Sequence, residues 1–144
     1  MIALLDVNVL LALVWPTHPS HTTAERWFAR HADEGWATCP FTHAGFVRVL
    51  SGPAFSPYAP SVADAREALR KNLRHPAHHF WPDVLPLPEA LALLGTTIVG
   101  HQQITDAYLL GLAIHNKGKV VTLDRSMQAL VQDANLTKIV EILR

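Results

Sequence analysis

The fold predicted for this chain depends most on one stretch, Ile2-Ala3-Leu4-Leu5-Asp6-Val7-Asn8-Val9-Leu10. Residues 2–5 form an apolar run of strand length that ends at Asp6, and residues 7–14 are apolar enough for a short helix after a tight turn. A second apolar strand, residues 119–123, ends at Asp124. In an open parallel α/β sheet the ligand crevice lies at the carboxyl ends of the strands, so the pattern favours that architecture.

The rest of the chain alternates short strands with helices. Further strands are predicted at residues 36–39, 80–81 and 138–143, and further helices at residues 22–32, 42–50, 61–74, 89–94, 105–116 and 126–133. Residues 22–25 resemble a capping box, and Thr105 is a plausible helix cap. Such alternation predicts an α/β fold, a three-layer α/β/α domain with a central, mostly parallel sheet of four to five strands. We expect residues 1–144 to form one domain.

Composition restricts the function classes. The chain has 144 residues, of which 49% are hydrophobic and 17% charged, which is typical of a compact protein with little disorder. Twelve basic and twelve acidic residues cancel, so contact with a polyanion requires a local patch. The single cysteine, Cys39, excludes an internal disulfide and is expected to be a buried thiol. We find no signal peptide and no apolar run approaching the ~20 residues of a membrane span, so we expect a cytoplasmic protein without a membrane partner.

Three aspartates each stand at the end of an apolar segment. Asp6 and Asp124 close strands, and Asp106 opens the apolar run of residues 107–114. A carboxylate beside a buried element is costly to desolvate unless something pairs with it. Taken singly, each aspartate is explained more often as a turn or helix cap than as a functional group. Three that converge repel one another, and a divalent cation relieves that repulsion, so together they predict a hard-metal site.

These segments resemble PIN-domain proteins, in particular the VapC toxins of bacterial toxin–antitoxin pairs. The resemblance rests on residues 4–10, 105–109 and 122–125, together with residues 39–50 and 100–104, and covers essentially the whole chain in the right order. It implies a PIN-like fold and a Mg²⁺- or Mn²⁺-dependent ribonuclease in which Asp6, Asp106 and Asp124 are catalytic and bind the metal. It also implies an RNA substrate, a homodimer, and an antitoxin partner that covers the acidic crevice.

One position departs from the family pattern. Where the family usually carries a fourth acid, a glutamate, this chain has His43, and the nearest acidic residues in sequence are Glu34 and Asp64. The resemblance implies that His43 stands in for the missing acid at the catalytic site. An imidazole is neutral near pH 7 and suits Mn²⁺ or Zn²⁺ better than Mg²⁺. A weaker nuclease, a nuclease retuned towards softer metals and an inactive site all remain open, as does a solvent-facing His43 without a role at the metal.

Two other function classes are compatible with the residues. A non-catalytic module would bind RNA or an antitoxin without cutting. A phosphate-transfer enzyme with Asp6 as nucleophile generally needs a second acid two residues on, where Asn8 stands, so it is disfavoured. Asn8 itself is expected to hold the turn after Asp6 rather than to reach the site. Three arginines line one face of a predicted helix: Arg66, Arg70 and Arg74. A solvent-exposed helix face explains them better than a binding track for RNA phosphates.

Overall fold

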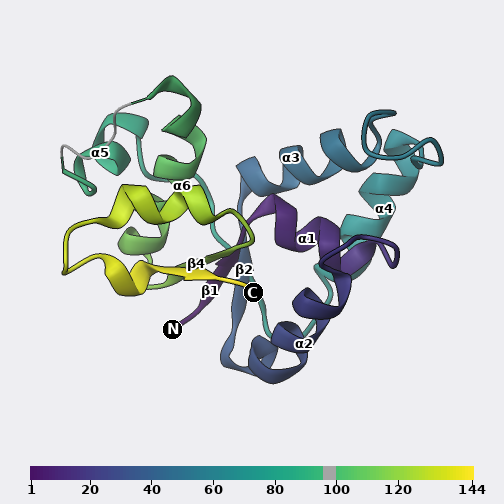
Figure 1. The fold of residues 1–144 in the computed structure, drawn as a ribbon, viewed down its shortest axis with the longest axis horizontal. Helices are drawn as coiled ribbons and strands as arrows, with labels where there is room; N and C mark the ends of the chain where they lie inside the picture. The colour runs from purple at the N-terminus through teal and green to yellow at the C-terminus, as the bar shows by residue number, and fades with distance from the viewer. Residues whose placement is uncertain (96–99) are drawn as a thin grey trace.

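The computed structural model describes residues 1–95 and 100–144, and over these residues it shows a five-stranded sheet with helices on both faces (Figure 1). The strands are β1 (Ala3–Leu5), β2 (Trp36–Thr38), β3 (His78–Phe80), β4 (Lys119–Thr122) and β5 (Val140–Ile142). The α-helices are α1 (Val7–Val14), α2 (His21–His31), α3 (Pro40–Leu50), α4 (Val62–Asn72), α5 (Leu87–Ala92) and α6 (Ile104–His115). Short 3-10 helices are η1 (Ala32–Glu34), η2 (His101–Gln103), η3 (Arg125–Val131) and η4 (Thr137–Ile139).

All strands run parallel in the order β3-β2-β1-β4-β5, so β1 lies at the centre of the sheet. Leu5 at the end of β1 is in register with Val121 of β4. The pairing extends one residue further, because the Asp6 N–H donates to the Val121 carbonyl at 3.0 Å. The carboxyl ends of β1 and β4 therefore meet side by side. The predicted parallel α/β sheet is confirmed.

Two buried apolar layers lie on opposite faces of the sheet. Leu4 belongs to the layer that includes α5 and α6, whereas Ala3 and Leu5 belong to the layer that includes α1 to α4. This alternation follows from the period of two along a strand. Figure 1 shows α5 and α6 on one side of the strands and α1 to α4 on the other. The predicted three-layer arrangement is confirmed, and Cys39 is a free, buried thiol as expected.

Helix α6 is buried along most of its length. Residues 107–113 are all buried, as expected of a helix that is apolar on every side. Gly111 allows the close approach of α5, because a Cβ there would lie 2.5 Å from the Ala90 carbonyl oxygen. This packing holds the first turn of α6, which carries Asp106, against the rest of the domain. Over the described residues, no helix is both long and apolar enough to cross a bilayer.

The third strand differs from the sequence prediction. It spans His78–Phe80 rather than residues 80–81, because it pairs with β2 in the register Trp36 to His78 and Thr38 to Phe80. His78 and His79 therefore belong to this strand, outside the predicted range. A polar strand at the edge of a sheet lacks the apolar run by which strands are recognised in a sequence.

Several predicted ends and caps also differ. Helix α2 begins at His21 without a capping box, and the His21 Nδ1 atom lies 2.6 Å from the Ala12 carbonyl oxygen, so a tertiary contact anchors its start. Thr105 is not a cap, because η2 leads directly into α6 at Ile104. The predicted helix 126–133 is the 3-10 helix η3. The predicted helix 89–94 is displaced by two residues to α5, and the predicted final strand 138–143 is shortened to β5.

Candidate metal centre at the carboxyl edge of the sheet

Asp6 lies at the junction between β1 and α1, where it is the N-cap of the helix. Its Oδ1 accepts a hydrogen bond from the Val7 N–H at 2.7 Å, and its Oδ2 accepts one from the Thr122 hydroxyl at 2.7 Å. The side chain is only 8% exposed. Burial raises the pKa of Asp6; the hydrogen bonds oppose that rise, and the negative charge of Asp124 adds to it.

Asn8 and Thr122 tie the ends of β1 and β4 together, an arrangement termed here the Asn8–Thr122 clamp. The Asn8 amide donates to the Asp6 Oδ2 at 3.3 Å and to the Thr122 Oγ1 at 3.1 Å, while its Oδ1 accepts the Leu123 N–H at 3.0 Å. The Asp124 N–H donates to the Thr122 Oγ1 at 3.0 Å. The preference for a turn role of Asn8 is therefore wrong, since its side chain reaches across to the second strand. Its partners lie 114 and 115 residues away in sequence, so no local signal reveals this contact.

Asp124 and Asp106 complete the acidic cluster. Asp124 is the N-cap of η3, and its Oδ1 accepts the Ser126 N–H at 2.9 Å. Asp106 is half-buried in the first turn of α6. Burial raises the pKa of Asp106 to about 6, with further contributions from the negative charges of Asp6 and Asp124. The three predicted aspartates thus lie close enough at the carboxyl edge of the sheet for their charges to interact.

The chemistry of this donor set suits a hard cation. Within residues 1–95 and 100–144, no lysine, arginine or histidine forms an ion pair with any of the three aspartates. Over the same residues, no three His, Cys, Asp or Glu side chains already stand in a ligating arrangement. The carboxylates lie near one another without converging on one point. Oxygen donors that carry uncompensated negative charge match the ligands that Mg²⁺ and Mn²⁺ take in proteins.

His43 is engaged with the neighbouring strands. It lies half-buried on α3, and its Nε2 atom is 2.7 Å from the Thr38 Oγ1 at the end of β2. The Nε2 of His78 is also 2.7 Å from that oxygen. The Thr38 hydroxyl has one proton and can donate to only one of the two imidazoles, and the role of each ring nitrogen depends on its tautomer. Burial lowers the pKa of His43, and burial followed by the His43 charge lowers the pKa of His78 to about 4. Thr38 is a partner that sequence reasoning missed, because His78 lies 40 residues away.

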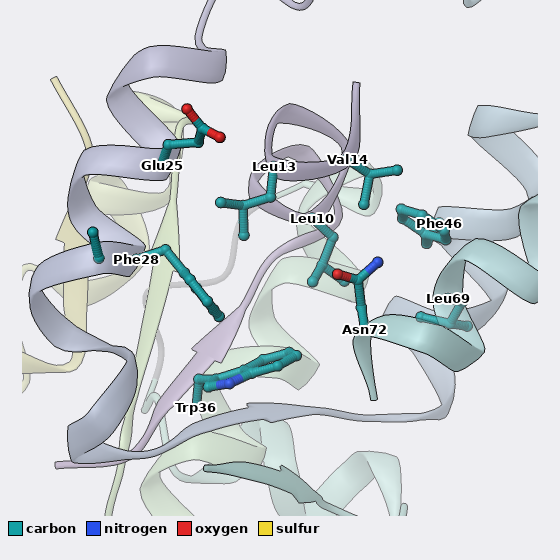
Figure 2. A pocket seen from close by; sticks show the side chains of 10 residues that line it. Leu10, Leu13, Val14, Glu25, Phe28, Trp36, Phe46, Leu69 and Asn72 are labelled. Atoms are coloured by element: carbon teal, nitrogen blue, oxygen red, sulfur yellow. The ribbon is translucent and has the colours of Figure 1, made fainter. Parts of the chain in front are cut away.

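A separate cavity of about 510 Å³ lies among α1, α2, α3, α4 and β2 (Figure 2). Its lining is mostly apolar and includes Leu10, Phe28 and Trp36, whose side chains point into the space. None of the three aspartates lines it. The acidic cluster is thus not part of this cavity, and the two features are distinct surfaces of the protein.

A comparison with protein families shows which family this chain is related to. The PIN domain matches residues 3–132. This chain belongs to the PIN-domain family. The family resemblance seen in the sequence is confirmed, and the matched range contains Asp6, Asp106 and Asp124 as well as His43.

Among its relatives are ribonucleases of Mycobacterium tuberculosis. Ribonuclease VapC39 of strain H37Rv is 40% identical over 145 residues, covering 99% of this chain and 100% of that protein. Ribonuclease VapC38 of the same strain is 42% identical over 137 residues, covering 95% of each. The crystal structure of VapBC2 from Rickettsia felis bound to a DNA fragment from its promoter matches with a TM-score of 0.69 over 100% of both chains. At 15% sequence identity, that last likeness shows the fold alone.

Proposed function

We propose that this PIN domain, residues 1–144, is a metal-dependent endoribonuclease toxin of the VapC kind that acts in the cytoplasm. The observation that carries the proposal is the cluster of Asp6, Asp106 and Asp124 at the edge where parallel strands end. Burial first, and neighbouring carboxylate charge second, raise the pKa of Asp6 and of Asp106 there. The relatives named ribonuclease VapC39 and VapC38, at about 40% identity, support RNA as the substrate.

The three aspartates would hold Mg²⁺ or Mn²⁺. A divalent cation there would offset the mutual repulsion of the carboxylates and lower the pKa of a water molecule for attack on an RNA phosphodiester. Asp6 is oriented for this role by the Asn8–Thr122 clamp, which fixes its Oδ2 through two donors. Burial and the charges of Asp6 and Asp124 raise the pKa of Asp106 to about 6, so a cation there would favour its ionised form. The chain's own part is therefore to position oxygen ligands and to keep them free of competing cations.

The test is cleavage of a panel of structured RNAs by the purified protein with Mg²⁺, with Mn²⁺ and with EDTA. We expect cleavage that requires the cation and is abolished by Asp6→Asn. An Asp64→Asn variant is a matched control, because Asp64 is also in the first turn of a helix but is exposed on α4. Cleavage that persists unchanged in Asp6→Asn would refute the proposal.

We also propose a homodimer and a cognate antitoxin as partners. The support is the likeness to VapC proteins and to the fold of VapBC2. The acidic cluster offers an antitoxin a negative surface, so a basic side chain in the antitoxin would complement it. Co-expression with a candidate antitoxin should yield a complex in size-exclusion chromatography, and cleavage by that complex should be suppressed. A chain that stays monomeric and unbound would refute the partner proposal.

A second candidate, a non-catalytic module that binds RNA or an antitoxin, is favoured by one observation. At the fourth position this chain carries His43, and the imidazole is hydrogen-bonded to Thr38 rather than to any of the aspartates. A His43→Glu variant separates the two functions. A large gain in cleavage identifies an otherwise competent nuclease site, whereas an unchanged absence of cleavage identifies the binding module.

A further inference from the structure

Two exposed phenylalanine rings lie at the same edge of the sheet as the acidic cluster. Phe41 is 44% exposed and is the second residue of α3, directly after β2 ends. Phe80 is 50% exposed and is the last residue of β3. Exposed apolar side chains that gather at one place and are rimmed by polar residues mark interaction sites, whereas single exposed ones are common. Neither ring has a role in the metal site.

Ring contacts place Phe41 beside the helix that carries Asp106. The centroid of the Phe41 ring lies 4.8 Å from that of Tyr108, which follows Asp106 by two residues on α6. Tyr108 is itself buried, and its hydroxyl donates to the Leu85 carbonyl at 3.0 Å, so it provides a fixed support. One face or edge of Phe41 is therefore held, while the rest of the ring stays open to solvent.

Phe80 is the second exposed ring, at the end of β3. Its ring centroid lies 5.3 Å from that of His43, with the planes tilted by 37°. In the strand order β3-β2-β1, the end of β3 is two strands from the end of β1, where Asp6 lies. At a spacing of about 4.8 Å between strands, this separation is roughly 10 Å. Phe80 and the acidic cluster are thus within reach of a few linked nucleotides.

The positively charged side chain of Arg48 lies further along α3. Phe41, Ala44 and Arg48 are all exposed, and their spacing of three and then four residues places them along one line of the helix. A rise of 1.5 Å per residue separates Phe41 and Arg48 by about 10 Å. The small side chain of Ala44 leaves the line between the ring and the cation open. The aromatic ring can stack on a base, and the guanidinium can contact a phosphate of the same strand. This pair of groups fits a nucleic acid better than an apolar protein surface.

We propose that Phe41 and Phe80 stack unpaired bases of the RNA beside the acidic cluster, with Arg48 contacting a backbone phosphate. This inference rests on the proposed nuclease function and names the residues that would hold the unpaired nucleotides of its substrate. A duplex hides its base faces within the stack, so only unpaired nucleotides present them to a ring. The two phenylalanines are positioning residues for the bases and Arg48 for the backbone.

The test is fluorescence anisotropy with a labelled unpaired oligoribonucleotide and with the same strand in a duplex. EDTA is present, so that binding is measured without cleavage. Phe41→Leu and Phe80→Leu keep an apolar side chain but remove the ring. Each is expected to weaken binding of the unpaired strand by roughly 5- to 100-fold, the range seen for loss of one base–aromatic stack. Phe41→Trp and Phe80→Trp should restore it, and the duplex should bind weakly and without dependence on either ring.

Tyr58→Leu is the matched control. Tyr58 is 85% exposed in the loop after the far end of α3, and its replacement should leave binding unchanged. Unchanged affinity in Phe41→Leu and Phe80→Leu would overturn the proposal. Loss of a dimer in sedimentation with RNA affinity unchanged would overturn it in favour of a protein interface. Cleavage without ring-dependent binding refutes the stacking alone, whereas ring-dependent binding without cleavage in Mg²⁺ or Mn²⁺ refutes the nuclease alone.

Discussion

Replacement of Asp106 by asparagine should stabilise the metal-free protein. The pKa of Asp106 is raised from its ordinary value of 3.8 to about 6, first by burial and then by Asp6 and Asp124. A rise of this size corresponds to roughly 3 kcal/mol of destabilisation once the carboxyl is ionised. Solvent screening of a half-buried group reduces this to about 1 to 2 kcal/mol. Loss of a carboxylate from the first turn of α6 costs about 0.3 to 1 kcal/mol through the helix dipole, which leaves a net gain of about 1 kcal/mol.

The pH dependence gives the sign of this effect. Because the folded-state pKa lies above the unfolded one, the folded protein retains the proton longer, and stability falls as pH rises from about 4 to about 6. Asparagine carries no charge at any pH. The advantage of Asp106→Asn should therefore be absent near pH 4 and complete above about pH 6.

The assay is thermal unfolding followed by circular dichroism in EDTA at pH 4 and pH 7.5. At pH 7.5 we expect Asp106→Asn to raise Tm by roughly 3 to 5 °C, and excess Mn²⁺ to stabilise the parent protein more than the variant. Asp64→Asn, at the corresponding helix position of α4, should give no gain. A variant less stable than the parent at pH 7.5, or an equal gain at both pH values, would contradict this expectation.

Three further outcomes follow from the same contacts. Thr122→Val removes the buried hydroxyl that donates to Asp6, so it should lower the free energy of unfolding by about 1 to 3 kcal/mol in urea titrations, whereas Thr122→Ser should retain most of the stability. Gly111→Ala should destabilise by about 1 to 3 kcal/mol, because the new methyl group would meet the Ala90 carbonyl at 2.5 Å; a thermal scan matching the parent would contradict that close approach. The lowered pKa of His78, about 4, means that its contribution to stability is lost as pH falls from about 6.5 to about 4, so His78→Gln should flatten that part of the stability profile; an unchanged acid limb would contradict it.

The sequence allowed the architecture to be predicted because the decisive elements are apolar and regular. Residues 7–14 were assigned to the helix that the structure shows as α1, and the strands ending at Asp6 and near Asp124 pair as neighbours. The aspartates could be predicted as a cluster because the carboxyl ends of parallel strands share one edge. What remained hidden is long-range and polar. The Asn8–Thr122 clamp joins residues 114 positions apart, and Thr38 bridges two histidines that no periodicity links.

The errors at element ends have a related cause. A capping box at residues 22–25 is a local pattern, but the contact of His21 with the Ala12 carbonyl decides where α2 starts. Likewise, β3 is a strand because β2 pairs with it, although His78 and His79 lack strand character of their own. Tertiary contacts override weak local preferences most readily at the edges of elements.

The proposed function requires that Asp6, Asp106 and Asp124 hold a divalent cation that supports RNA cleavage. The dependence of the cleavage rate on Mn²⁺ concentration, measured for the parent protein, Asp6→Asn and Asp64→Asn, tests it most directly. We expect a saturable rise for the parent and for Asp64→Asn, and a rate for Asp6→Asn no higher than in EDTA. Equal Mn²⁺ dependence in all three proteins, or no cleavage by any of them, would contradict it.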